Sequence, residues 1–180
     1  MAAAQRLTTL VEHVRAAAGR VCPPERTASL VGEALRAHLP TRDVLTPAQL
    51  AGDPDGYTQH ILHVEPDGLF SVVALVWRPG QATPIHDHLC WCVVGVVDGV
   101  ESEVRYRLAE RDGRAHLVED GVVENPAGSV CGFAPPGDIH EVRNAGDGTA
   151  VSIHVYGADI SRVGSSIRRR YDLPVRPALR

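Results

Sequence analysis

The chain has 180 residues and a net charge of -4, and all 18 of its basic residues are arginine. This length suits a single domain with a buried core, and the absence of an extended basic block excludes a typical nucleic-acid-binding protein. The four cysteines are too irregularly spaced for a disulfide framework, which favours a reduced compartment. The missing lysine and the many Ala and Val residues indicate a GC-rich bacterial coding bias.

The first twenty residues have no continuous apolar core and include Glu12, so we expect no signal peptide. No apolar run approaches the roughly 18 residues that a membrane-spanning helix needs. We therefore expect a cytoplasmic protein without a membrane partner. A barrel with helices over its outside also predicts a monomer.

Residues 1–52 are expected to form a helical N-terminal extension. Apolar residues recur at helical spacing over residues 3–18. Pro23-Pro24 starts a second predicted helix that ends before Pro40, and Thr46-Pro47 starts a short third one. These helices are expected to cover one face or mouth of a barrel, and a partner-binding role is the alternative.

From Tyr57 the pattern changes to short alternating segments bounded by Gly, Pro, Asp and Asn. It predicts an all-β core, a jelly-roll barrel over residues 57–156, followed by a tail (157–180) with a short helix and an extended arm. The expected strands, besides those of the segment 80–99, are 57–64, 69–77, 101–108, 115–118, 121–123, 130–134, 139–143 and 150–156.

The segment from Gly80 to Gly99 contains the clearest candidate for a metal site. His86 and His88 are two residues apart, so on a strand both side chains project from one face and can bind the same ion. The spacing G-x5-H-x-H-x3-E-x6-G resembles the first signature of the cupin barrels, except that Cys92 stands in place of the glutamate ligand.

A second segment resembles the other cupin signature, P-x-G-x2-H-x3-N, through Pro135, Gly137, His140 and Asn144. The resemblance implies a cupin fold in which His86, His88 and His140 bind a metal. Three neutral imidazoles suit Fe, Zn, Cu and Ni, and without a carboxylate the ion keeps its full charge and favours an anionic ligand such as a thiolate. Asp87 is expected to point away and to hydrogen-bond a loop.

Residues 151–156 alternate strictly, with Ser152, His154 and Tyr156 on one face and apolar residues on the other. If the apolar face packs outward, the polar row lines the barrel cavity, where a tyrosine hydroxyl can donate a hydrogen bond to oxygen or to a substrate carboxylate. The alternative is an edge strand with a solvated polar face.

Together these motifs resemble the thiol dioxygenases, which include cysteine dioxygenase and 3-mercaptopropionate dioxygenase. The resemblance covers about residues 57–156. It implies Fe(II) as cofactor, O2 as co-substrate, and oxidation of a small thiol to its sulfinic acid. It also implies iron ligation by the three histidines and a catalytic triad of Ser152, His154 and Tyr156.

The subfamily and the substrate stay open. Gln59 stands where the animal enzymes have an arginine that binds the substrate carboxylate, which resembles the bacterial mercaptopropionate branch. Cys92 resembles the animal cysteine that crosslinks to the tyrosine, so a thioether between Cys92 and Tyr156 is a candidate. Arg162 and Arg168 are candidates for binding a carboxylate; without one, cysteamine-like or bulkier thiols such as ergothioneine are alternatives.

Two rival functions are kept. A non-catalytic cupin would bind metal and a small ligand without consuming oxygen. A cupin isomerase, or a dioxygenase for a substrate other than a thiol, would share the metal site, but the Ser-His-Tyr row argues against both.

Overall fold

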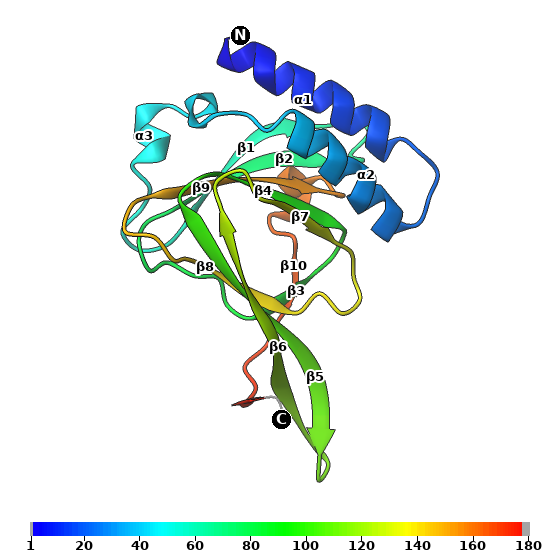
Figure 1. Ribbon diagram of the computed structural model, residues 1–180. Helices are drawn as coiled ribbons and strands as arrows, with labels where there is room; N and C mark the ends of the chain where they lie inside the picture. The colour runs from blue at the N-terminus through cyan, green and yellow to red at the C-terminus, as the bar shows by residue number, and fades with distance from the viewer. Residues whose placement is uncertain (1, 178–180) are drawn as a thin grey trace.

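The computed structural model describes residues 2–177, beginning with helices that lie against one side of a β-structure (Figure 1). They are α1 (Ala3–Ala18), α2 (Pro24–Ala37), a 3-10 helix (Arg42–Val44) and α3 (Pro47–Leu50). Thr46 caps α3 as predicted, because its hydroxyl accepts a hydrogen bond from the Gln49 backbone N–H. No helix among residues 2–177 is long and apolar enough to cross a membrane.

Two sheets form the core of the molecule. The first has the order β1-β2-β9-β4-β7, with bounds β1 Thr58–Val64, β2 Ser71–Trp77, β9 Ala150–Tyr156, β4 Cys92–Asp98 and β7 Val130–Phe133. The second has the order β10-β3-β8-β5-β6-β11, with bounds β10 Ile167–Arg170, β3 His86–His88, β8 His140–Asn144, β5 Val100–Arg111, β6 Arg114–Pro126 and β11 Val175–Arg176. The all-β cupin core with helices outside is confirmed.

The main apolar core lies between the helices and the outer face of the first sheet, which the helices cover in Figure 1. Burial of this surface stabilises the fold by roughly 25 cal/mol per Å². At Gly95 on β4, an added Cβ would lie 2.6 Å from the end of the Leu39 side chain, so a larger residue here would push that side chain aside. The fully buried residues include Leu10, Val14, Val31, Leu35, Val93, Ile153 and Val155.

The predicted break between strands 115–118 and 121–123 was wrong, because one strand, β6, runs through both segments. Val104 pairs with Val122 and Tyr106 pairs with Glu119, so β6 has one more residue than β5 between these two pairs. Gly121 lies in this stretch of β6 and has φ +125°. Glycine thus marks a β-bulge inside a strand. The β5–β6 hairpin projects away from the helices (Figure 1).

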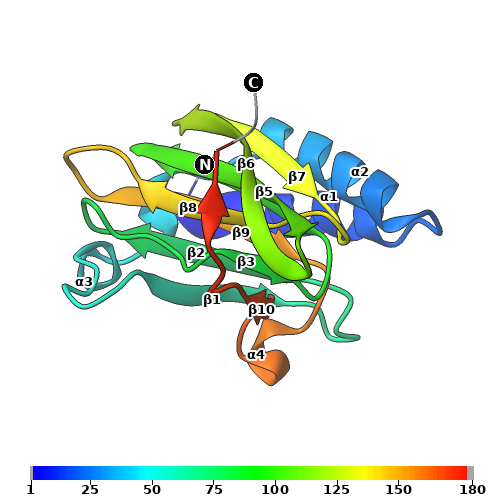
Figure 2. The same cartoon turned by 90° about the horizontal axis from the view of Figure 1, so that it is seen from below.

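Over residues 157–177 the C-terminal tail forms the predicted short helix and an extended part that pairs as two strands, while residues 178–180 of the predicted arm lie outside the described residues. After the short helix α4 (Ile160–Val163), β10 pairs with β3 and β11 pairs with β6, so the tail completes the second sheet. Figure 2, the view from below, shows α4 leading into β10 beside β3. The tail therefore lies directly against the strand that carries two of the candidate ligands.

Candidate metal centre

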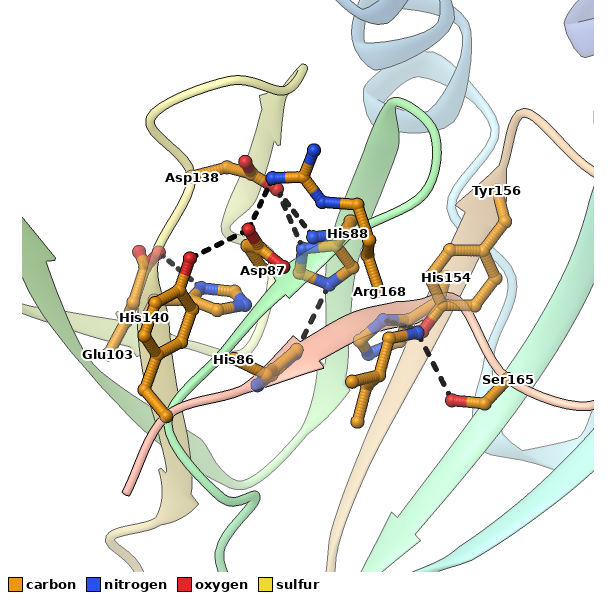
Figure 3. A network of polar contacts seen from close by, with 12 residues as sticks. His86, Asp87, His88, Glu103, Asp138, His140, His154, Tyr156, Ser165 and Arg168 are labelled. Carbon is orange, nitrogen blue, oxygen red and sulfur yellow. Dashed lines mark hydrogen bonds and ion pairs between the residues drawn. The ribbon is translucent and has the colours of Figure 1, made fainter. Parts of the chain in front are cut away.

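Two neighbouring strands of the second sheet bring the three candidate ligands together. His86 and His88 lie on β3, and His140 on β8 is the register partner of His86. All three side chains are buried, and one ligand atom of each lies within 4.8 Å of the others. Figure 3 shows the three rings close to one another. The structure thus assembles the set that the two sequence motifs predicted.

The outer nitrogen of each ring is held by an oxygen atom, which leaves the inner nitrogen free for a metal. Because the acceptor is a carbonyl or a carboxylate, Nδ1 carries the proton and Nε2 presents its lone pair. This tautomer is the one that a metal needs, so the residues fit a divalent ion. The contacts are His86 Nδ1 to the Pro84 carbonyl (2.8 Å), His88 Nδ1 to Asp138 Oδ2 (3.0 Å) and His140 Nδ1 to Glu103 Oε1 (2.8 Å).

Electrostatics keep the site ready for a cation. Burial, and then the neighbouring His140 and His88, lower the pKa of His86 to about 3, so its ring is neutral near pH 7. Burial alone would raise the pKa of Glu103, but hydrogen bonds from His140 and Arg105 outweigh it and lower the pKa to about 2. A negative charge therefore lies directly behind one ligand, although no carboxylate belongs to the three-histidine set.

Asp87 lies between the two histidines of β3 in the sequence but is bound to the C-terminal segment. Its carboxylate accepts a hydrogen bond from Arg168, which Figure 3 shows beside it, and another, at 2.8 Å, from the Tyr171 hydroxyl. The side chain is almost completely buried. Asp87 was expected to hydrogen-bond a loop, and its partner is the C-terminal tail, which this contact holds beside the candidate metal centre.

The polar row of β9 lies inside the molecule. The Ser152 hydroxyl is 2.9 Å from His154 Nε2, and the Tyr156 hydroxyl is 3.0 Å from His154 Nδ1. Since β9 is paired with β2 on one side and β4 on the other, it is not an edge strand. Burial lowers the pKa of His154 to about 3 and raises that of Tyr156 well above its ordinary value, so both side chains are uncharged near pH 7.

A cavity of about 40 Å³ connects the metal centre with this row. Ser152 lies behind the cavity wall, where the Trp77 indole donates to its hydroxyl at 3.2 Å. Neither candidate arginine lines the cavity: Arg162 is exposed on α4, and Arg168 is paired with Asp87. The predicted site residues in its wall are Gln59, His86, His88, Cys92, His140, His154 and Tyr156.

Sequence reasoning missed the acidic residues around this site. Glu101 and Glu103 are two apart on β5, and both line the cavity. Their spacing by two within the predicted strand 101–108 was the available signal, because such residues share one face of a strand. Asp138, behind His88, was not detectable, since its place depends on the loop before β8.

The two sheets and the histidines that line the cavity define a cupin whose candidate metal site is built from three histidines. Residues 47–169 match the family of cysteine dioxygenase type I, and the chain belongs to that family.

Several solved structures are also similar. A cupin 2 conserved barrel domain protein from Salinispora arenicola is 24% identical over 67% of this chain and 89% of its own, with a TM-score of 0.46. TT1209 from Thermus thermophilus is 21% identical over 63% of this chain and 95% of its own, with a TM-score of 0.45. An RmlC-like cupin from Desulfovibrio desulfuricans is 22% identical over 58% of this chain and 86% of its own, with a TM-score of 0.42.

Proposed function

We propose that the protein is a thiol dioxygenase that adds both atoms of O2 to the sulfur of a small thiol, giving the sulfinic acid. The overall reaction, R–SH + O2 → R–SO2H, is balanced without a further reductant. The observation that carries the proposal is the placement of a neutral three-histidine set beside a buried Ser-His-Tyr row in one small cavity. Family membership supports the same class of reaction.

We propose Fe(II) as the metal, held by Nε2 of His86, His88 and His140. Iron bound there would supply the redox chemistry that dioxygen requires. The chain contributes the geometry: three protein ligands grouped on the second sheet leave the cavity side open to substrate. The carboxylates of Glu103 and Asp138 orient two of the rings and strengthen them as donors.

Tyr156 is proposed to position the reactants in the cavity. Burial keeps its hydroxyl protonated, so the O–H group is available to donate a hydrogen bond to oxygen or to the substrate. His154, itself neutral and held by Ser152, fixes the position of that hydroxyl. The small volume of the cavity keeps bulk water away and favours a small thiol.

The substrate is proposed to be 3-mercaptopropionate or a cysteine-like thiol, with Gln59 in the cavity wall as a polar contact. A second candidate is a cysteamine-like thiol, which has no carboxylate. One observation favours it: among residues 2–177, no arginine lines the cavity, so no guanidinium is in place to bind a carboxylate. Bulkier thiols such as ergothioneine would require the cavity to widen.

The test is oxygen uptake by Fe(II)-loaded protein with 3-mercaptopropionate, cysteine, cysteamine and ergothioneine in turn. We expect at least one thiol to consume one O2 for each sulfinic acid formed, and the His140→Ala protein to consume none. Metal retention without oxygen uptake from any thiol would instead support a non-catalytic cupin.

A further inference from the structure

Glu101 is a buried acid for which the three-histidine centre gives no role. It lies on β5 with 2% of its surface exposed, and it lines the cavity. Its Oε1 atom has no hydrogen-bond partner among the described residues. An unpartnered carboxyl oxygen in such a place is costly, so the arrangement calls for an explanation.

Ser152 and Trp77 lie beside this carboxyl, where hydrogen bonding from them lowers its pKa in part. Ser152 is also the first member of the polar row, 2.9 Å from His154 Nε2, and His154 Nδ1 is 3.0 Å from the Tyr156 hydroxyl. These contacts run from Ser152 to Tyr156 in the cavity wall, and Glu101 lies next to Ser152, where a hydrogen bond would extend the row. Each member between the two ends can both donate and accept.

Such a row has two self-consistent directions, and the state of Glu101 selects one. If Glu101 is protonated, it donates to Ser152, Ser152 donates to His154 Nε2, and His154 Nδ1–H donates to the Tyr156 oxygen. The Tyr156 O–H then points into the cavity. If Glu101 is ionised, Ser152 donates to it, His154 Nε2–H donates to Ser152, and the Tyr156 O–H turns to His154 Nδ1.

We propose that Glu101 is a positioning residue that sets the direction of this hydrogen-bonded row and thereby turns the Tyr156 hydroxyl toward or away from the cavity. The two directions differ by the one proton that Glu101 gains or loses, together with the tautomer of His154. Only the consequence for turnover rests on the proposed thiol dioxygenase activity. The tautomer change itself does not depend on it.

The surroundings allow Glu101 to change state near neutral pH. Burial raises its pKa to about 7, although hydrogen bonding from Ser152 and Trp77 lowers it in part and the charge of Glu103 raises it. The other titratable groups close to this end of the cavity are His154 on β9, Cys131 on β7, and Tyr57, which stacks on Trp77. Burial raises the pKa of Cys131 to about 12 and that of Tyr57 above its ordinary value, so both stay neutral.

The direct test is ¹⁵N NMR of the histidine rings in the metal-free protein, between about pH 5 and pH 9. A spectrum of the His154→Asn protein assigns the His154 signals. We expect the proton of His154 to move from Nδ1 to Nε2 as the pH rises through the pKa of Glu101. In the Glu101→Gln protein, the tautomer should not change with pH.

Glu110→Gln is the matched control, because Glu110 is exposed on the same strand, and this protein should keep the wild-type change. Ser152→Ala interrupts the row on another strand and should abolish the change even if Glu101→Gln folds poorly. A single tautomer throughout the range in the wild type, or an unaltered change in Glu101→Gln, would overturn the proposal.

Turnover gives a second readout once an active thiol is found. The ratio of kcat for wild type to kcat for Glu101→Gln should fall as pH rises through about 7, because the ionised acid turns the Tyr156 O–H away. The ionisation of the thiol itself affects both proteins equally, so its effect cancels in this ratio. The KM of Glu101→Gln should differ little from that of the wild type. A ratio that does not change with pH would contradict the role of Glu101 in turnover. If no thiol caused oxygen uptake, the proposed function would be contradicted, but the NMR result would be unaffected.

Discussion

Cys92 on β4 is the direct register partner of Tyr156 on β9. Directly opposed residues of an antiparallel pair project from the same face, with Cβ atoms typically about 4.5–5.5 Å apart. Both side chains are buried and line the cavity. The thiol that replaces the cupin glutamate therefore lies beside the tyrosine of the polar row.

This pairing predicts a thioether between Cys92 Sγ and the Tyr156 ring after turnover with iron and O2. Forming the S–C bond removes one hydrogen from each side chain, and O2 accepts the two electrons and two protons. Intact mass spectrometry should show a species lighter by two hydrogens. The Cys92→Ala protein should show no such species, whereas Cys22→Ala, which changes a cysteine outside the cavity, should still form it.

Replacing His140 by Ala should abolish iron retention, because it removes one of the three proposed protein ligands. Metal analysis after gel filtration measures the effect. His60→Ala on β1 is the control. His60 lies outside the cavity wall, so its replacement should leave iron retention unchanged. Full iron occupancy in the His140→Ala protein would contradict the ligand set.

Glu103→Gln should weaken metal binding while leaving the ligands in place. The substitution removes the carboxylate that accepts the His140 Nδ1 proton at 2.8 Å, and loss of such a partner typically costs roughly 10- to 100-fold in affinity or activity. Competition with a chelator measures the affinity. Glu110→Gln on the exposed part of β5 is the control, and equal affinities for the two variants would show that Glu103 is dispensable.

The metal-free protein should lose stability on acidification. His86 and His154 have a pKa of about 3 in the fold against 6.5 ordinarily, so the unfolded chain binds these protons first. The stability that neutral His provides is full above pH 6.5 and declines below it, by up to about 1.4 kcal/mol per pH unit for each histidine. Urea unfolding at several pH values measures this slope, which should be shallower for His86→Gln.

Arg168→Gln tests whether this arginine binds a substrate carboxylate. The guanidinium is held by Asp87 outside the cavity wall, so we expect KM to change by a similar factor for 3-mercaptopropionate and for cysteamine. Oxygen-uptake kinetics with the two thiols provide the comparison, and Arg162→Gln on α4 is the control. A rise in KM confined to the carboxylate substrate would place Arg168 at the substrate after all.

The sequence by itself determined most of the elements and the three histidines that the fold brings together. Spacing by two put His86 and His88 on one face of a strand, and the alternation through Ser152, His154 and Tyr156 separated a cavity face from a core face. Prolines and Thr46 located the helix starts. These features are local, because strand periodicity and helix capping depend on residues a few positions apart.

Only the tertiary structure decided what surrounds the ligands. Glu103 lies behind His140 and Cys92 lies opposite Tyr156 because distant strands meet in one register, which no local spacing encodes. Arg168 forms an ion pair with Asp87 because β10 of the tail pairs with β3. Strand pairing is selected by the burial of side chains far apart in the chain, and so the charges around the metal centre appear only when the sheets are assembled.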